Sequence, residues 1–333
     1  MENLEYRPIR EDETAKIIDL FKRNNMPFDV EFIIRLLNLS IPPKSIILGS
    51  FHKDELVGLY SLYAYKLYFA GNIEDAAIAS FITTDKAVRG KGLGTGLIEE
   101  LAGYAKTVGL DFISAFIDTK LGGWKDVINK GWERFGYHYK QLSILTPFFR
   151  PYGSKLPEIS TNELSSFQVN KLSFEHIEEA QSFAQSFYNR YYIAELPDQN
   201  TARQLELYPE KYHWFSIDYG GRKVGYISCF HYLVHKGNKI QEQIHFNHLV
   251  VDEVYLPGAV NAVISKLESL DFKPDIYVIN NSSLISTIFL YRAAFHPGFS
   301  RIQQVLRCRS KKKFVMDIFQ KIDGTLPFSL TIL

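Results

Sequence analysis

Residues 89–96 of this 333-residue chain read Arg-Gly-Lys-Gly-Leu-Gly-Thr-Gly, with a glycine at every second position. Glycine tolerates positive φ and a close backbone approach, so the stretch can form a tight loop. A helix is predicted to follow, and the backbone N–H groups at its start would point outward together. Such a loop binds an anion, above all a phosphate or a pyrophosphate, and the side chains of Arg89 and Lys91 add positive charge.

Other glycine-rich patterns fit this stretch less well. A dinucleotide fingerprint requires Gly-x-Gly-x-x-Gly with an acidic residue at the end of a following strand, and neither condition is well satisfied here. A Walker loop requires Gly-Lys-Ser/Thr after four spacer residues, and that sequence is absent. A plain turn that only joins a strand to a helix stays open.

The elements predicted around the loop would place it at the end of a buried strand. Residues 76–82 are small or apolar, which is typical of a strand buried on both faces. Leu93, Leu97 and Leu101 recur at helical spacing and predict a helix over residues 92–107. The rest of the first half predicts a hairpin formed by residues 46–51 and 56–65. It also predicts strands over residues 112–117 and 141–149 and a helix over residues 124–135.

Composition limits the class of protein. Hydrophobic residues make up 46% and charged residues 23%, as in ordinary globular proteins, and the net charge is +1. This balance predicts no nucleic-acid or membrane partner, and no apolar run of about 18 residues predicts a membrane span. Two cysteines cannot build a disulfide framework. Without a signal peptide at the start of the chain, we expect a cytoplasmic protein.

The second half repeats the order of the first: strand, helix, hairpin, strand, helix, strand, helix, strand. A segment rich in proline, glycine and serine, residues 150–157, separates the halves. The repeat predicts an internal duplication with domains at residues 1–155 and 164–333. The length, at roughly 100–200 residues per domain, agrees with two domains, and a homodimer stays open.

The first half resembles the GNAT acyltransferases. Arg89-x-x-Gly92-x-Gly94, placed between a strand and a helix, looks like the acetyl-CoA signature of that family. Residues 6–10 and 54–58 resemble its first strand and its hairpin, and the resemblance covers about residues 4–150. It implies an α/β (α+β) fold with two GNAT-like domains, each a mixed, mostly antiparallel central sheet flanked by helices.

The resemblance also implies a cosubstrate site for acetyl-CoA without a metal. The strand residues Ile82, Thr83 and Thr84 would pair with the pantetheine amides. The pyrophosphate would be wrapped by the backbone of Arg89, Gly90, Lys91, Gly92, Leu93, Gly94 and Thr95. The acceptor amine would attack the thioester directly in a ternary complex, with a strand N–H stabilising the oxyanion.

The residues for proton transfer depart from the family pattern. Trp132 occupies the position where the family often has a tyrosine as general acid, and an indole does not donate a proton usefully near neutral pH. Trp132 could instead pack on the CoA, and Tyr137 is a candidate for the missing hydroxyl. Glu74, upstream of the predicted strand 76–82, is a candidate general base. A solvated turn is the alternative for Glu74.

The acceptor groove of this family is lined by the loop between the first two helices. In this chain that loop is residues 24–29, and Asn25 and Phe28 are the candidate lining residues. Amide, aromatic and acidic groups together suit the amine of a small molecule or a peptide. The alternative is a loop that only ends a helix.

The second half lacks the glycine-rich loop. The corresponding position holds one glycine, Gly258, and Asp252 and Glu253 just before it would repel a pyrophosphate. We expect a degenerate GNAT-like domain that shapes the acceptor site or an interface. His245 and His248 lie three apart on a predicted strand and so face opposite sides, which predicts no metal site.

The sequence therefore predicts an acyl-CoA-dependent N-acyltransferase, with acetyl transfer from acetyl-CoA to an amine. The alternative is a non-catalytic CoA-binding or regulatory module, because neither a general acid nor a general base is evident. An enzyme that transfers an aminoacyl group from charged tRNA would need no CoA loop, so the intact loop disfavours it.

Overall fold

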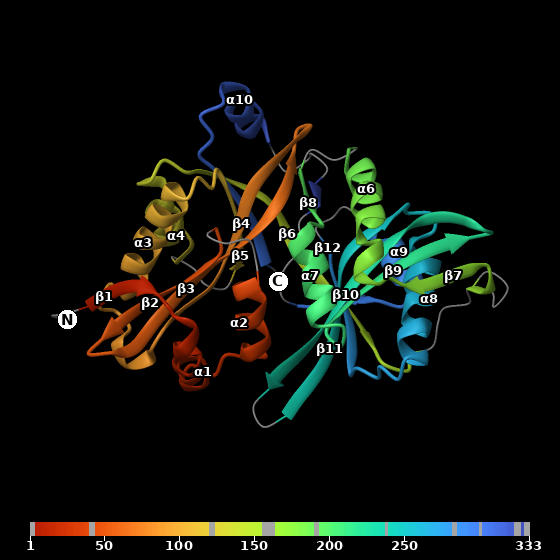
Figure 1. Cartoon of the computed structure of the whole chain (residues 1–333), viewed down its shortest axis with the longest axis horizontal. Coiled ribbons are helices and arrows are strands. Elements are labelled where there is room, and N and C mark those ends of the chain that lie inside the picture. Colours follow the sequence, from red (N-terminus) through yellow and green to blue (C-terminus); the bar gives the residue numbers. More distant parts are fainter. Residues whose placement is uncertain are drawn as a thin grey trace. The chain divides into compact units, whose positions relative to one another are not determined.

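A computed structural model describes residues 4–39, 44–119, 124–154, 164–189, 193–236, 239–281, 285–299, 302–322 and 328–329. The chain forms two compact units (Figure 1). Unit 1 comprises Met1–Ser143 with Ile302–Leu326, and unit 2 comprises Ile144–Arg301 with Pro327–Leu333. Both units combine helices with a mixed, mostly antiparallel sheet, which confirms the predicted fold class.

Unit 1 follows the predicted element order. Its elements are β1 (Leu4–Pro8), η1 (Glu11–Glu13), α1 (Thr14–Arg23), α2 (Val30–Leu39), β2 (Ile46–His52), β3 (Glu55–Phe69), β4 (Asn72–Thr84), η2 (Lys86–Val88), α3 (Leu93–Thr107), β5 (Phe112–Asp118), α4 (Trp124–Glu133), the beginning of β6 (His138–Pro151), β14 (Ile302–Cys308) and α10 (Lys313–Lys321). The predicted hairpin, buried strand and helix after the glycine-rich loop are all present.

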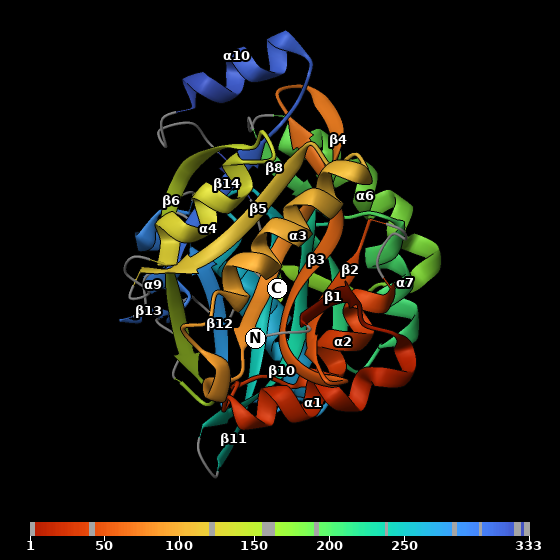
Figure 2. The ribbon, with the colours of Figure 1, turned by 90° about the vertical axis from the view of Figure 1, so that its left-hand side faces the viewer.

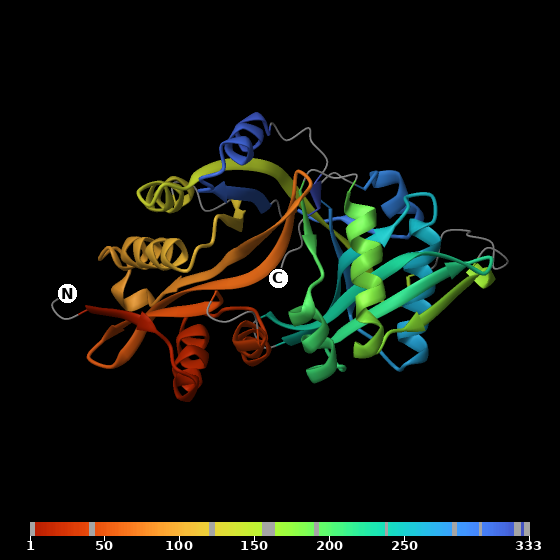
Figure 3. The ribbon, with the colours of Figure 1, turned by 45° about the horizontal axis from the view of Figure 1, so that its top comes forward.

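The sheet of unit 1 runs in the order β1-β2-β3-β4-β5-β14. Only β4 and β5 are parallel in this series, because α3 carries the chain back across the sheet between them. Helices α3 and α4 cover one face and α1 and α2 the other (Figures 2 and 3). The core under α3 and α4 is built from residues of β2 to β5 and both helices.

The sequence boundary at residues 155–163 lies outside the described residues, and the division it predicts needs correction. Strand β14 pairs antiparallel with β5 over its whole length and so belongs to unit 1. The later part of β6 pairs with β12 (Ile276–Asn281) in unit 2. Each unit thus contains one strand from the other half of the sequence: β14 in unit 1 and the later part of β6 in unit 2. Hydrophobic periodicity identifies a strand but does not say which sheet it joins.

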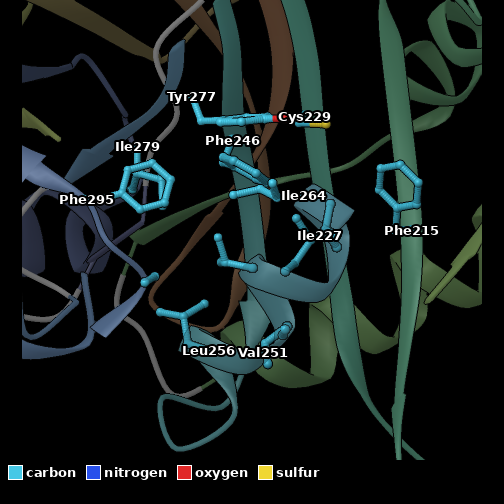
Figure 4. Packing of buried hydrophobic residues seen from close by; sticks show 14 of the residues in the cluster. Phe215, Ile227, Cys229, Phe246, Val251, Leu256, Ile264, Tyr277, Ile279 and Phe295 are labelled. Atoms are coloured by element: carbon cyan, nitrogen blue, oxygen red, sulfur yellow. The ribbon is translucent and has the colours of Figure 1, made fainter. Parts of the chain in front are cut away.

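Unit 2 contains the remaining elements. They are β7 (Phe167–Lys171), η4 (Phe174–His176), α6 (Ile177–Tyr188), β8 (Ile193–Leu196), α7 (Gln199–Leu207), β9 (Tyr212–Tyr219), β10 (Arg222–Lys236), β11 (Lys239–Val251), α8 (Leu256–Ser269), β12, α9 (Thr287–Arg292), β13 (His296–Pro297) and β15 (Phe328–Ser329). Its sheet runs β6-β12-β11-β10-β9-β7. Leu256 and Ile264 of α8 pack against a core that includes Ile227 and Phe246 (Figure 4).

Both units carry the same irregularity in their central hairpin. In unit 1, Tyr60 of β3 faces the two residues Phe81 and Ile82 of β4. In unit 2, Ser228 of β10 faces two residues of β11, Asn247 and His248. Two residues opposite one define a β-bulge. The repetition of this detail supports an internal duplication.

Three histidines with lowered pKa values predict that unit 2 is sensitive to acid. Burial, together with the charges of Lys171 and His231, lowers the pKa of His213 to about 3. Burial also lowers the pKa of His245 to about 3 and that of His248 to about 4. Because the unfolded chain binds these protons near pH 6.5, the free energy of unfolding falls as the pH decreases below that value. We expect a loss of about 1 kcal/mol per histidine between pH 6.5 and 5.5.

Urea unfolding at the two pH values measures this loss. His213→Phe is the matched variant, because the ring is fully buried, packs edge-on against Phe272, and its two nitrogens have no hydrogen-bond partner among the described residues. It should remove about one third of the pH dependence, because His245 and His248 remain. An unchanged slope in His213→Phe would contradict the assignment.

Candidate active site

The glycine-rich loop joins η2 to the first residue of α3. Gly90 and Gly92 both have φ of +80°, and Gly92 is the residue that precedes the helix. A Cβ atom at either position would meet nothing within 4 Å, so backbone conformation, not space, requires glycine here. Gly96 N–H donates to the Gly92 carbonyl at 3.1 Å. The N–H groups that precede it have no partner inside the helix, as at every helix start, and can donate hydrogen bonds to an anion.

The positive side chains of the loop lie beside this helix start. Arg89 Nη2 donates to Asn24 Oδ1 at 3.1 Å, and Arg89 Nε donates to the Thr84 carbonyl at 3.4 Å. These bonds hold the guanidinium between the end of α1 and the end of β4. Lys91 is exposed. The loop therefore contains a helix N-terminus and the two cationic residues Arg89 and Lys91.

One carboxylate lies next to the loop and is already neutralised. Asp85 accepts a hydrogen bond from Ala87 N–H at 3.0 Å and pairs with Arg23 Nε at 2.7 Å. These two partners hold the pKa of Asp85 below its usual range. Asp85 is therefore an ionised turn residue and not a free base.

Strand β4 leaves an open edge beside the loop. Its parallel pairing with β5 ends at Ala79 and Ala115, although β4 continues to Thr84. Among the described strands, none pairs with β4 on that side beyond Ala79. The bulge sits at this point, and Phe81 adopts φ of +57°, a conformation that non-glycine residues avoid. The predicted residues Ile82, Thr83 and Thr84 occupy this open segment.

The loop between α1 and α2 lies against the bulge. Phe28 makes an edge-to-face contact with Phe81, with ring centroids 5.9 Å apart. Thr83 Oγ1 donates a weak hydrogen bond to Met26 Sδ at 3.6 Å. Asn25 is exposed and has φ of +54°. The structure thus brings the predicted acceptor loop to the predicted cosubstrate strand, with Phe28 at their contact.

Trp132 does not belong to this site, and its prediction as a CoA contact needs correction. The indole is fully buried in the core between the sheet and α4. Its ring packs edge-to-face on Tyr137, with centroids 5.1 Å apart, and the Arg307 guanidinium lies 5.5 Å from its centre. A ligand in the open edge of β4 cannot reach a side chain that the core encloses.

The prediction of Tyr137 as the general acid needs the same correction. Its side chain is fully buried, and its hydroxyl donates to the Leu110 carbonyl at 2.7 Å. Burial raises the pKa of Tyr137 to about 12. The hydroxyl therefore ties the chain after α4 to the end of α3 and has no path to a leaving thiolate.

Glu74 lies at the opposite end of β4 from the bulge. It is inside the strand and pairs with Lys312 Nζ at 2.7 Å. Seven residues of extended chain separate it from Phe81, which is about 23 Å at 3.3 Å per residue. The structure therefore does not bring Glu74 to the loop. Strand β4 begins at Asn72, so Glu74 lies near its start, whereas the loop follows its end.

Sequence reasoning missed two residues of the site. Phe81 shapes the bulge, and no local pattern marks a positive φ at a phenylalanine. Trp124, the first residue of α4, is 44% exposed, and its six-membered ring reaches Gly94. A tryptophan at the start of the helix after β5 could have been noted, but the sequence does not show where its ring points.

Unit 2 keeps the bulge but not the loop. The pairing of β11 with β12 ends at Phe246 and Ile279, so β11 also leaves an open edge. At the bulge, His248 stacks on Trp214, with ring centroids 5.3 Å apart, and donates its backbone N–H to Ser228 Oγ. Helix α8 begins with Leu256 and Pro257 and has no glycine-rich approach.

Within the described part of the chain, no three His, Cys, Asp or Glu side chains come close enough together to hold a metal ion. Among the described helices, none is long and apolar enough to cross a membrane.

Comparison with known proteins agrees with this geometry. Residues 5–116 match the family model of the acetyltransferase (GNAT) domain, and no curated protein matches the chain. N-myristoyltransferase of Saccharomyces cerevisiae with bound myristoyl-CoA superposes with a TM-score of 0.72 at 14% identity, covering 100% of this chain and 85% of that one. A GCN5-related N-acetyltransferase from Anabaena variabilis superposes at 0.60 and 11% identity, covering 92% and 73%. Residues 5–116 in unit 1 therefore match an acetyltransferase (GNAT) domain, and the chain as a whole shares the fold of these two solved structures.

Proposed function

We propose that the chain is an acyl-CoA-dependent N-acyltransferase that transfers an acetyl group from acetyl-CoA to an amine. The observation that carries the proposal is the open edge of β4 at its bulge, directly before the glycine-rich start of α3. A thioester lying in that opening would have its pyrophosphate at the helix N-terminus and its carbonyl at strand backbone.

The binding roles follow from the backbone. The N–H groups at the start of α3, residues 92–95, would donate to the pyrophosphate, and Arg89 and Lys91 would balance its charge. The free edge at Ile82–Thr84 would pair with the amides of the pantetheine. A backbone N–H at the bulge would stabilise the oxyanion that forms when the amine attacks, an effect worth about 3–4 kcal/mol in other enzymes.

The acceptor amine would approach from the loop of residues 24–29, where Phe28 contacts Phe81 of the bulge and Asn25 is exposed. The amine must lose a proton before it attacks. Since neither Glu74 nor Tyr137 reaches the site, we propose that water carries this proton away and that the CoA thiolate leaves without a dedicated acid.

A short acyl group is supported by the packing beneath the bulge. Tyr60, the residue opposite the bulge, and Trp132 are both buried in the core on the α3 side of the sheet. These two large rings fill space that a long acyl chain would need. The yeast myristoyltransferase that shares the fold was solved with a fourteen-carbon chain, so chain length is the sharpest distinction to test.

Thermal unfolding with acetyl-CoA, octanoyl-CoA and myristoyl-CoA tests the proposal. A ligand at 100 times its Kd stabilises a protein by about 2.7 kcal/mol. We expect this gain with acetyl-CoA, a smaller one with the longer acyl groups, and CoA release when an accepted amine is added. Absence of any shift would contradict CoA binding altogether.

Gly92→Glu with Gly109→Glu is the matched pair for this test. Both glycines have positive φ, +80° and +74°, and a Cβ at either would meet nothing within 4 Å. The backbone strain of the two substitutions should therefore be similar. Only Gly92→Glu places a carboxylate at the predicted pyrophosphate site, so only that variant should lose the stabilisation by acetyl-CoA.

A non-catalytic CoA-binding module is the second candidate. It is favoured by the burial of Tyr137 and the distance of Glu74 from the bulge, which leave neither of these two residues in a position to transfer a proton. Stabilisation by acetyl-CoA without CoA release across a panel of small and peptide amines would support this function over transfer.

A further inference from the structure

Trp124 is the one tryptophan of this chain that reaches the surface. It begins α4 and is 44% exposed, whereas Trp132 and Trp214 are fully buried. Indole is a large, mostly apolar ring system, and exposing nearly half of it to water is unfavourable. A flat partner that covers the exposed part of the ring would recover that free energy.

The ring lies on the phosphate-binding end of α3. A Cβ atom built on Gly94 would come within 2.5 Å of Trp124 Cη2, so the edge of the six-membered ring rests where that side chain would be. Gly94 is the second residue of α3. Glycine at this position is therefore required by the close approach of the indole, and not by backbone conformation.

Further contacts show that α3 and α4 run in the same direction. Gly94 meets Trp124 near the start of both helices, and Gly131 meets Ile98 one to two turns later. Gly103 meets Phe135 at the other end. The two helix N-termini therefore lie together at the end of the sheet where β4 opens, and the indole stands between them.

We propose that the exposed face of Trp124 is the platform for the adenine base of the CoA nucleotide. The inference rests on the proposed function. A pyrophosphate held by the N–H groups at the start of α3 brings the adenosine next to the ring that touches Gly94. An aromatic side chain can bind a base by stacking on its π face, without base-specific hydrogen bonds.

Tryptophan fluorescence tests the platform directly, because the other two tryptophans are buried. Titration of the full chain with 3′-phosphoadenosine 5′-diphosphate should quench the exposed component of the emission and shift it to shorter wavelength. The probe 4′-phosphopantetheine, which lacks the base, should leave that component unchanged. Trp124→Leu should abolish the response to the nucleotide.

Affinity provides the second measurement. Trp124→Leu should raise the Kd for acetyl-CoA by roughly tenfold, the effect of losing one stacked base. An unchanged Kd for acetyl-CoA in Trp124→Leu would overturn the platform.

Gly94→Ala and Gly103→Ala form a matched pair that leaves Trp124 itself intact. Both add one methyl group to α3 against an aromatic ring, at 2.5 Å from Trp124 and at 3.2 Å from Phe135. Gly94→Ala must displace the indole and should weaken nucleotide binding. Gly103→Ala should leave it unchanged, since Phe135 lies at the other end of the helix.

The outcomes separate this inference from the proposed function. If acetyl-CoA stabilises the parent and Trp124→Leu equally and the fluorescence does not respond, the platform is overturned and CoA binding stands. If 4′-phosphopantetheine quenches and the adenine nucleotide does not, the ring contacts the pantetheine and the platform is likewise overturned. If acetyl-CoA does not stabilise the parent, both proposals fail.

Discussion

A chain that ends at Arg301 should lose the cooperative unfolding of unit 1. The truncation removes β14, which pairs with β5 from Ile302 to Cys308, together with α10. Val305 and Leu306 are fully buried. Burial of each such side chain is worth about 1.5–3 kcal/mol, and seven residues of ladder are lost in addition. The sum is comparable with the roughly 5–15 kcal/mol that stabilises a domain.

The loss of stability is increased because removal of β14 leaves buried polar groups without partners. Arg307 Nη2 donates to Asn129 Oδ1 at 2.8 Å inside the core, and the guanidinium packs on Trp132. Without β14 the Asn129 side chain and the edge of β5 would lose their partners. An unsatisfied buried polar group costs about 1–3 kcal/mol.

Urea unfolding followed by near-UV circular dichroism checks this result. The control is a chain that ends at Ile322 and so retains β14 and α10. It should unfold cooperatively and bind acetyl-CoA, and the chain that ends at Arg301 should do neither. Cooperative unfolding of an isolated fragment of residues 1–155 would contradict the exchange of strands between the two halves of the sequence.

Trp132→Ala should destabilise unit 1 by about 3–5 kcal/mol, the range for a large aromatic side chain removed from a core. The ring is fully buried, and its removal deprives both Tyr137 and Arg307 of a packing surface. Because no part of the indole reaches the open edge of β4, the Kd for acetyl-CoA of the folded variant should stay at the parent value.

Denaturant unfolding and the ligand-induced thermal shift separate these two quantities. Trp124→Leu should behave in the opposite way, with little loss of stability and a weaker acetyl-CoA complex. If Trp132→Ala proves too unstable to purify, Trp132→Phe retains an aromatic ring and should give a smaller loss with the same unchanged affinity. A Trp132 variant that remains stable but binds acetyl-CoA poorly would contradict this prediction and support a contact between Trp132 and the cosubstrate.

Local features of the sequence predicted the loop well. Alternating glycines between a buried strand and a helix permit positive φ just before the helix begins. Gly90 and Gly92 both have positive φ, and Gly92 directly precedes α3. This prediction succeeds because the conformation of a short loop depends on the residues within it. The order of strands and helices, which depends on hydrophobic periodicity over a few turns, was predicted for the same reason.

The catalytic candidates could not be predicted in this way. Trp132 and Tyr137 were chosen by their position in a motif, but their side chains point into the core under α4. Glu74 was chosen as a residue just before a strand, and β4 begins two residues earlier, at Asn72, with the bulge at its far end. The direction of a side chain and the length of a strand depend on neighbours that are distant in the sequence.

The sequence by itself determined that this chain has a glycine-rich loop before a helix in its first half, a repeated order of elements, and no such loop in its second half. Those properties are encoded by residues close together in the chain. Only the tertiary structure decided that β14 completes unit 1, that the end of β6 completes unit 2, and that Trp124 and not Trp132 stands at the loop. Strand partners and ring positions result from hydrogen bonding and packing between residues far apart in sequence, which local periodicity does not record.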